Sequence, residues 1–219
     1  MIAAIVFDFD GVLVDSEPLH LRAYQDVLEP LGISLPREEY YASYLGYDDE
    51  GAFRAIAAAR RWPLDEAQLR ELIAAKARVY DEIVASGDVF YPGATACITR
   101  LAAKYPLGIA SGAQKQEIET LLAASRLAHH FRFVVASGDT AASKPAPDPY
   151  RRAAELHGLP PGECLAIEDS RWGIASAKTA GLWCIGIANT YPVAELLEAD
   201  AVISSLDEFT PALIESIGG

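Results

Sequence analysis

The sequence predicts an α/β fold, a doubly wound, Rossmann-like parallel sheet core with an inserted α-helical cap domain. Short apolar runs with β-branched residues alternate with amphipathic helical stretches over most of the chain. Residues 18–86 instead show only helical periodicity, directly after the first apolar run. Of the 219 residues, 51% are hydrophobic and 22% are charged, so a sizeable buried core is expected.

The predicted strands share a short, continuously apolar character, and they cover residues 3–7, 107–110, 133–136, 164–167, 183–187 and 201–203. Such runs are typical of parallel strands that helices cover on both faces. Helices are predicted between most of them, over residues 94–104, 115–124, 149–157, 173–180 and 193–199. Alternating strands and helices predict right-handed βαβ units.

The helical insertion is predicted as a separate cap domain over residues 16–87, with helices at 19–31, 50–60 and 66–84. The α/β core domain is then expected to combine residues 1–15 with residues 88–219. The junctions are placed near Asp15-Ser16 and Gly87-Asp88.

Charge and composition exclude several classes of function. The 18 basic and 31 acidic residues give a net charge of −13, the wrong sign for binding a nucleic-acid backbone. No apolar run reaches the roughly 18–20 residues that a membrane span needs, and residues 1–6 lack the positive charge of a signal peptide. Three cysteines without a C-x-x-C pair indicate reduced thiols. We therefore expect a cytoplasmic protein, a monomer or weak homodimer, without nucleic-acid or membrane partners.

Residues able to do chemistry follow four of the predicted strands, and they are Asp8, Asp10, Ser111, Gly112, Lys144, Glu168 and Asp169. Each group alone could be ordinary: a polar turn, a helix N-cap, a surface lysine or a solvated loop. Because the carboxyl ends of parallel strands lie at one edge of a sheet, we expect these residues to converge. Ser111 and Gly112 are expected at the start of a helix, where amide groups and the helix dipole bind anions.

Clustered carboxylates repel one another and hold protons unless a cation lies among them. Mg²⁺ suits such a cluster, because it prefers oxygen ligands and binds substrate phosphates. A lysine and a serine loop at the same edge are suited to phosphate oxygens. The set therefore indicates phosphoryl transfer, with one Asp as the nucleophile and its neighbour two residues on as the general acid and base.

The segment 8–17, Asp-Phe-Asp-Gly-Val-Leu-Val-Asp-Ser-Glu, resembles the first motif of the haloacid dehalogenase (HAD) superfamily. More narrowly, it is similar to the β-phosphoglucomutase-like phosphatases, which carry a helical cap after this motif. The later motifs follow in family order: Ser111, Lys144 within Ser-Lys-Pro-Ala-Pro-Asp, and Ile-Glu-Asp-Ser at 167–170. The resemblance covers nearly the whole chain.

This resemblance implies a role for each carboxylate. Asp8 would be the nucleophile and a metal ligand, and Asp10 would be the general acid and base, with its backbone carbonyl on Mg²⁺. Asp169 would bind the metal, and Glu168 would bind it directly or through water. An Asp at position 10 argues against dehalogenation, because haloalkanoic acid dehalogenases lack an acid there.

The resemblance also implies contacts to the substrate. Ser111, with Gly112, would bind the transferring phosphoryl group, and Lys144 would neutralise its charge and tie it to Asp8. In the cap, His20 matches a histidine of the cap linker, and Lys76 matches a lysine that binds substrate. A surface histidine and a solvated helix lysine are the alternative interpretations of these two residues.

The cap departs from the mutase pattern at residues 46–50, Gly-Tyr-Asp-Asp-Glu. Mutase-like caps carry an arginine just after this glycine to bind a second phosphate, whereas the first arginine downstream here is Arg54. Since an acidic loop would repel a bisphosphate, we expect a Mg²⁺-dependent phosphatase for a small phosphorylated metabolite, with a sugar phosphate as the favoured class. The alternatives are a β-phosphoglucomutase-type mutase and a non-catalytic protein that retains the fold.

Overall fold

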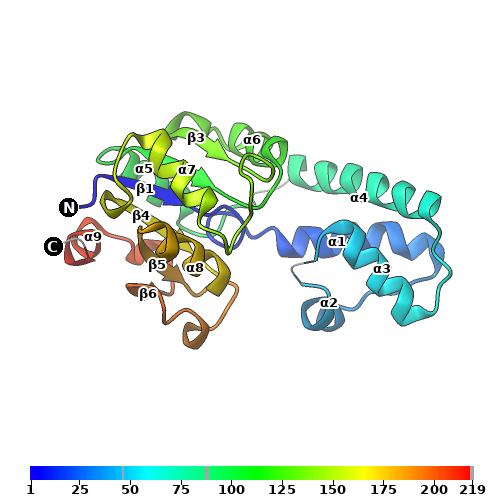
Figure 1. Cartoon of the computed structure of the whole chain (residues 1–219). Helices are drawn as coiled ribbons and strands as arrows, with labels where there is room; N and C mark the ends of the chain where they lie inside the picture. Colours follow the sequence, from blue (N-terminus) through cyan, green and yellow to red (C-terminus); the bar gives the residue numbers. More distant parts are fainter. Residues whose placement is uncertain (46, 87–88, 218–219) are drawn as a thin grey trace. The chain divides into compact units, whose positions relative to one another are not determined.

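The computed structural model describes residues 1–45, 47–86 and 89–217, and the chain divides into two compact units (Figure 1). The sheet unit combines Met1–Asp15 with Val89–Gly219, and the helical unit comprises Ser16–Asp88. The predicted junction at Gly87-Asp88 lies outside the described residues. That the helical unit acts as a cap stays a prediction.

The sheet unit contains one parallel sheet in the order β3-β2-β1-β4-β5-β6. Its strands are β1 (Ala4–Phe7), β2 (Leu107–Ala110), β3 (Phe131–Val135), β4 (Cys164–Glu168), β5 (Trp183–Ile187) and β6 (Ala201–Ile203). The order reverses at β1, which pairs with β2 on one side and β4 on the other. This arrangement confirms the predicted doubly wound fold.

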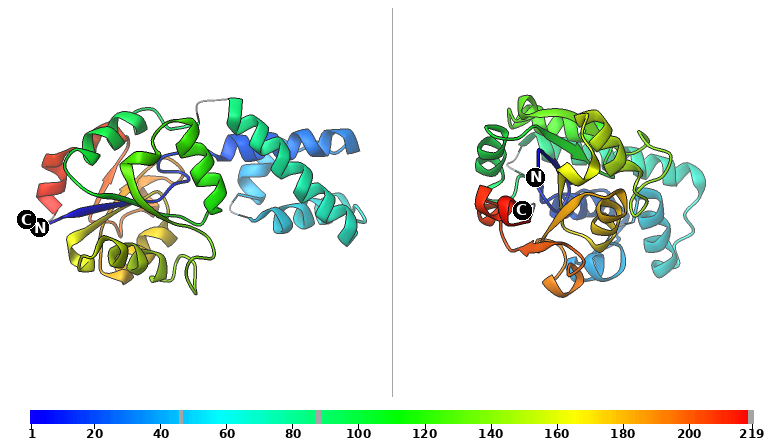
Figure 2. Two further views of the ribbon diagram at one scale, coloured as in Figure 1. Left: turned by 90° about the horizontal axis from the view of Figure 1, so that it is seen from above. Right: turned by 60° about the vertical axis from the view of Figure 1, so that its left-hand side comes forward.

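Helices cover the sheet on both faces: α5 (Ala94–Ala102), α6 (Lys115–Ala124), α7 (Asp148–His157), α8 (Arg171–Ala180) and α9 (Pro211–Ile217). Helices α7 and α8 pack against each other on one face, and α5 and α9 lie on the opposite face (Figure 2). Because both faces are covered, every residue of β1, β2 and β4 is buried. Short 3₁₀ turns among the described residues are η1 (Glu29–Leu31), η2 (Ala128–His130), η3 (Pro161–Glu163), η4 (Val193–Glu195) and η5 (Leu206–Glu208).

Alternate residues of β1 contribute to the two halves of the core. Ala4 and Val6 belong to the cluster that includes Tyr150 of α7. Phe7 meets Phe131 and Phe209 edge to face, with ring centroids 6.1 and 6.5 Å apart. The central strand is thus fixed from both sides up to the residue before Asp8.

The helical unit consists of α1 (Glu17–Leu28), α2 (Arg37–Ser43), α3 (Asp49–Arg60) and α4 (Glu66–Ser86). It has its own apolar core, which includes Tyr24, Phe53 and Leu69. The side chain of Asp48 caps α3 by accepting a hydrogen bond of 2.8 Å from the amide of Gly51. Within the described part of the chain, no helix combines the length and apolar character that crossing a bilayer requires.

Several predicted boundaries differ from the structure. Strand β3 begins at Phe131, two residues earlier than predicted, because Arg132 interrupts the apolar run and an edge strand tolerates an exposed charge. The helix predicted over 193–199 is wrong, since only the turn η4 forms there. The helices α2 and α9 were not individually predicted, because seven residues are too few to reveal a helical period.

Candidate active site

Three carboxylates lie together at the carboxyl ends of β1 and β4. Phe7 pairs with Ile167, so the residues that follow them in these adjacent strands emerge next to each other. Carboxylate oxygens of Asp8, Glu168 and Asp169 lie within 4.8 Å of one another. All three residues are at most 9% exposed.

Lys144 reaches this cluster from the segment between β3 and α7. Its Nζ lies 3.0 Å from Asp8 Oδ1 and 2.6 Å from Glu168 Oε1. Burial alone would lower the pKa of Lys144, but the two carboxylates outweigh it and raise the pKa, so the side chain is a fixed cation. The hydroxyl of Tyr150 also donates to Glu168 Oε1 at 2.6 Å.

The first turn after β1 orients Asp8 and Asp10. The amide of Phe9 donates to Asp8 Oδ1 at 2.7 Å, which adds to the hold of Lys144 on the same oxygen. The amide of Gly11 donates to the carbonyl of Val14 at 2.9 Å and closes the turn that carries Asp10, which is half-buried.

Gly11 is required by both conformation and space. Its φ is +74°, and a Cβ there would lie 1.9 Å from Asp169 Oδ2. The side-chain amide of Asn189 donates to the Gly11 carbonyl at 2.8 Å, and the hydroxyl of Thr190 hydrogen-bonds to Asp169. Asn189 and Thr190 were missed in the sequence, although they follow β5 as the predicted site residues follow other strands.

The N-terminus of α8 packs directly on Glu168. A Cβ at Gly173 would lie 1.9 Å from the carboxyl carbon of Glu168. Ser170 caps the helix by accepting a hydrogen bond of 3.1 Å from the amide of Gly173. The helix therefore fixes the fully buried carboxylate that in turn holds Lys144.

The electrostatics of the cluster favour a bound cation. Burial raises the pKa of both Glu168 and Asp169, and the neighbouring Asp8 raises them further. When ionised, the three carboxylates carry three negative charges, and the only lysine, arginine or histidine side chain within ion-pair distance of them among the described residues is Lys144. Three converging carboxylates with excess negative charge fit a hard divalent ion with oxygen ligands, such as Mg²⁺.

Ser111 and Gly112 lie directly after β2, as predicted, but not at the start of a helix. Helix α6 begins at Lys115, with Gln114 as its N-cap residue. The hydroxyl of Ser111 instead accepts a hydrogen bond of 3.1 Å from the amide of Ala113. Gly112 is exposed, and a Cβ there would meet no atom within 4 Å, so space does not explain this glycine.

His20 and Lys76 meet within the helical unit. Lys76 Nζ lies 2.8 Å from His20 Nδ1, and the imidazole stacks on Tyr80 with ring centroids 4.4 Å apart. Burial, with the charge of Lys76, lowers the pKa of His20 to about 3, so the neutral ring accepts the bond from the ammonium. The solvated-lysine interpretation of Lys76 is wrong, because this side chain is buried.

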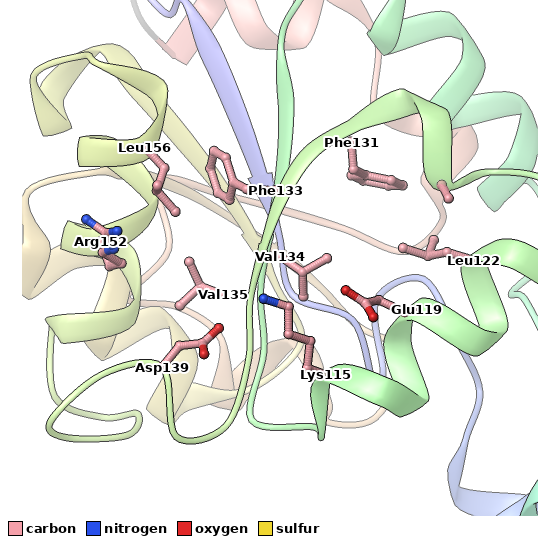
Figure 3. Close-up of a pocket in the computed structure, with 11 residues that line it drawn as sticks. Lys115, Glu119, Leu122, Phe131, Phe133, Val134, Val135, Asp139, Arg152 and Leu156 are labelled. Atoms are coloured by element: carbon pink, nitrogen blue, oxygen red, sulfur yellow. The ribbon is translucent and has the colours of Figure 1, made fainter.

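A cavity of about 560 Å³ on the sheet unit lies elsewhere, along β3 between α6 and α7 (Figure 3). Its lining mixes apolar side chains such as Phe133 and Leu156 with Lys115, Glu119 and Arg152. None of the predicted site residues lines it. The predicted site residues therefore lie at the carboxylate cluster and not in this cavity.

Comparison with known proteins identifies the family of this chain. Residues 2–181 match the family model described as haloacid dehalogenase-like hydrolase. Protein CbbY of Rhodobacter capsulatus is 38% identical over 192 residues, with 82% of each chain covered. Phosphoglycolate phosphatase of Escherichia coli K12 is 30% identical, with 97% of this chain and 92% of the relative covered.

A crystal structure of CbbY from Rhodobacter sphaeroides in complex with xylulose-(1,5)bisphosphate resembles this chain with a TM-score of 0.80 at 28% identity. The similarity covers 95% of this chain and 96% of that one. The family match spans most of the chain and includes Asp8, Lys144 and Asp169. The chain therefore belongs to the haloacid dehalogenase-like hydrolase family and is an enzyme, a phosphatase of that family.

Proposed function

We propose that the enzyme hydrolyses the monophosphate ester of a small metabolite, with a sugar phosphate as the favoured class, through an aspartyl-phosphate on Asp8. The observation that carries the proposal is the convergence of Asp8, Lys144, Glu168 and Asp169 at one edge of the sheet. The names of the phosphoglycolate phosphatase relatives support phosphate-ester hydrolysis as the reaction.

In the first half-reaction, a carboxylate oxygen of Asp8 attacks phosphorus and forms an O–P bond while the ester P–O bond breaks. The carboxylic acid of Asp10 gives its proton to the leaving alkoxide. In the second, Asp10 takes a proton from water as the water oxygen attacks phosphorus. Inorganic phosphate leaves and the Asp8 carboxylate is regenerated.

Lys144 and Ser111 fit the stabilisation of the phosphoryl group. Lys144 is a fixed buried cation on the nucleophile, so it is placed to neutralise charge on the transferring oxygens. The hydroxyl and loop amides of Ser111 and Gly112 follow the strand adjacent to β1 and would donate to the same group.

The carboxylates of Asp8, Asp169 and Glu168, with the Asp10 carbonyl, would hold Mg²⁺. The bound ion would supply charge neutralisation at the phosphate and keep the clustered acids ionised. Oxygen-only donors and their excess negative charge support this choice of metal.

The helical unit supports a monophosphate ester over a bisphosphate. Lys76, the cation that the family resemblance assigns to substrate binding, lies 2.8 Å from Asp49 Oδ1, and its side chain is only 4% exposed. The hydroxyl of Tyr24 donates to the same Asp49 oxygen at 2.7 Å. Since Asp49 already neutralises Lys76, this lysine offers no free positive charge to a second phosphate, which disfavours a mutase.

The first test is Asp8→Asn, assayed by phosphate release from a panel of pentose, hexose and short-chain phosphates with and without Mg²⁺. We expect turnover to be lost while circular dichroism shows an unchanged fold, because the amide cannot form the acyl phosphate. Asp26→Asn, at an exposed ion pair on α1, is the matched control and should retain wild-type activity. Substantial activity in folded Asp8→Asn would refute the covalent route, and no Mg²⁺-dependent hydrolysis of any ester would favour a non-catalytic protein.

The mutase alternative has its own test. The enzyme is incubated with β-glucose 1-phosphate and a trace of glucose 1,6-bisphosphate, and both glucose 6-phosphate and free phosphate are followed. We expect free phosphate to form faster. Faster formation of glucose 6-phosphate would establish the mutase instead.

A further inference from the structure

Two aromatic residues of the sheet unit closely follow groups of the acidic cluster along the chain. Trp172 is the second residue of α8, three positions after Asp169. Tyr191 directly follows Thr190, whose hydroxyl hydrogen-bonds to Asp169. The two rings meet edge to face, with centroids 5.9 Å apart. The segment after β4 thus carries Asp169 and the ring of Trp172, and the segment after β5 carries the hydroxyl that binds Asp169 and the ring of Tyr191.

Trp172 of this aromatic pair is open to solvent, whereas Tyr191 is half-buried against the core. Trp172 is 43% exposed, which is unusual for the largest apolar side chain. The guanidinium of Arg171 lies over its indole, 4.3 Å from the ring centroid, and the Arg171 side chain is 58% exposed. The nearest acid to Arg171, Glu195, is 3.8 Å away, so this ion pair is loose. Arg171 therefore retains hydrogen-bonding capacity next to the exposed ring surface.

Aromatic surface next to polar groups is typical of sites that bind small organic molecules. The face of an indole is electronegative, whereas the C–H groups on one side of a cyclic sugar are weakly positive, so the two surfaces attract. A two-carbon acid offers no such surface. An acyclic polyol can present such a surface only if its flexible chain becomes ordered, and this ordering costs conformational entropy.

We propose that Trp172 and Tyr191 form a subsite for the leaving group, and that this leaving group is a sugar in its ring form. The inference rests on the proposed function, because it names the part of the substrate that departs from the phosphate. Arg171 would donate hydrogen bonds to ring hydroxyls.

The test compares kcat and KM for glucose 6-phosphate and glycerol 3-phosphate. Both are phosphate monoesters of an uncharged alcohol, but only the first has a cyclic sugar as its leaving group. Trp172→Ala should raise KM for glucose 6-phosphate roughly 3- to 10-fold and leave kcat within about twofold. KM for glycerol 3-phosphate should stay unchanged, and Trp172→Phe should restore most of the affinity. The matched control is Trp183→Phe, which changes a tryptophan at the opposite end of β5 that donates to the Gly162 carbonyl.

An equal rise in KM for both esters, or no rise for either, would overturn the subsite. A binding measurement separates this outcome from failure of the proposed function. In Asp8→Asn, glucose 6-phosphate should change tryptophan fluorescence, and the change should vanish with Trp172→Phe but persist with Trp183→Phe. A fluorescence change that survives Trp172→Phe would also overturn the proposal, whether or not the wild-type enzyme turns over any ester.

Discussion

Lys144 is the residue that balances charge inside the carboxylate cluster. It contacts both Asp8 and Glu168, and Glu168 is fully buried. Removing the ammonium leaves two facing carboxylates and takes away the cation for the phosphoryl oxygens. Removing Lys144 should therefore lower the rate of hydrolysis more than removing an exposed lysine does.

We expect Lys144→Met to lower kcat/KM by roughly 10²- to 10³-fold, as the loss of a transition-state donor does elsewhere. The kcat/KM of the variant is measured by phosphate release in the presence of Mg²⁺, and circular dichroism checks that the variant is folded. Lys104→Met, at an exposed position after α5, is the control and should keep wild-type activity. A folded Lys144→Met with near wild-type kcat/KM would remove this lysine from the reaction.

Gly173 is the residue that lets α8 approach Glu168. A methyl group there would overlap the Glu168 carboxylate, so Gly173→Ala must displace either the helix or the carboxylate. We expect a loss of stability of about 1–3 kcal/mol in urea unfolding, together with reduced activity. Gly162→Ala is the matched control, because a Cβ at Gly162 would meet open space. Equal stability of the two variants would contradict the close approach.

At the scale of the elements, the end of α7 carries a half-buried histidine against β3. His157 meets Phe133 edge to face at 4.6 Å, and burial lowers its pKa to about 4. In the unfolded chain, His157 is protonated below about pH 6.5. In the folded chain, it is protonated only below about pH 4. Stability conferred by neutral His157 is present above pH 6.5 and is lost as the pH falls toward 4.

We expect His157→Gln to lose about 1–2 kcal/mol less stability than the wild type between pH 7 and pH 4.5, which is the shift at 1.36 kcal/mol per unit reduced for solvent screening of a half-buried group. Urea unfolding followed by circular dichroism at the two pH values measures the difference. Gln116→Ala, at an exposed position of α6, removes no titratable group and should follow the wild-type pH dependence. Parallel pH curves for His157→Gln and wild type would disprove the assignment.

Element type was predictable where burial dominates and poorly predictable where it does not. The strands β1 and β4 are covered on both faces, so their continuous apolar runs identified them. Edge strand β3 and the segment 193–199 lack that constraint: Leu196 is fully buried, whereas its neighbour Leu197 is 70% exposed. A pattern of apolar residues cannot distinguish a helix from an irregular loop that buries single side chains.

At the scale of the whole molecule, the prediction of a common edge for distant residues is confirmed for Asp8, Lys144, Glu168 and Asp169. It follows from topology alone, because parallel strands end at the same edge. The partners that hold this cluster were not predictable in the same way. Tyr150 lies inside a helix, and only the packing of α7 brings its hydroxyl to Glu168.

Metal binding should stabilise the whole enzyme. Asp8, Glu168 and Asp169 repel one another without a cation, so Mg²⁺ should bind the folded chain in preference to the unfolded one. We expect millimolar Mg²⁺ to raise the melting temperature of metal-stripped enzyme by several degrees, at roughly 2–4 °C per kcal/mol. The measurement is thermal unfolding with and without the ion.

Asp169→Asn should abolish this rise, and without Mg²⁺ it should melt at or above the wild-type temperature. The reason is that burial and the neighbouring carboxylates raise the pKa of Asp169, so this acid lowers the stability of the metal-free fold at every pH above its ordinary pKa, and an uncharged amide does not. Asp26→Asn should keep the full response to Mg²⁺. An Asp169→Asn variant that responds like the wild type would place the ion elsewhere.

The central position of β1 has a consequence for biosynthesis. The ribosome makes this apolar strand before its two neighbours, because β2 and β4 begin only at Leu107 and Cys164. At roughly 5–20 residues per second, the nascent strand waits on the order of ten to thirty seconds for its second neighbour. During that time the unpaired backbone groups at both edges of β1 can be bound by chaperones. A chain truncated before β4 would lack Glu168 and Asp169 and would expose an unpaired edge of β1, which favours aggregation.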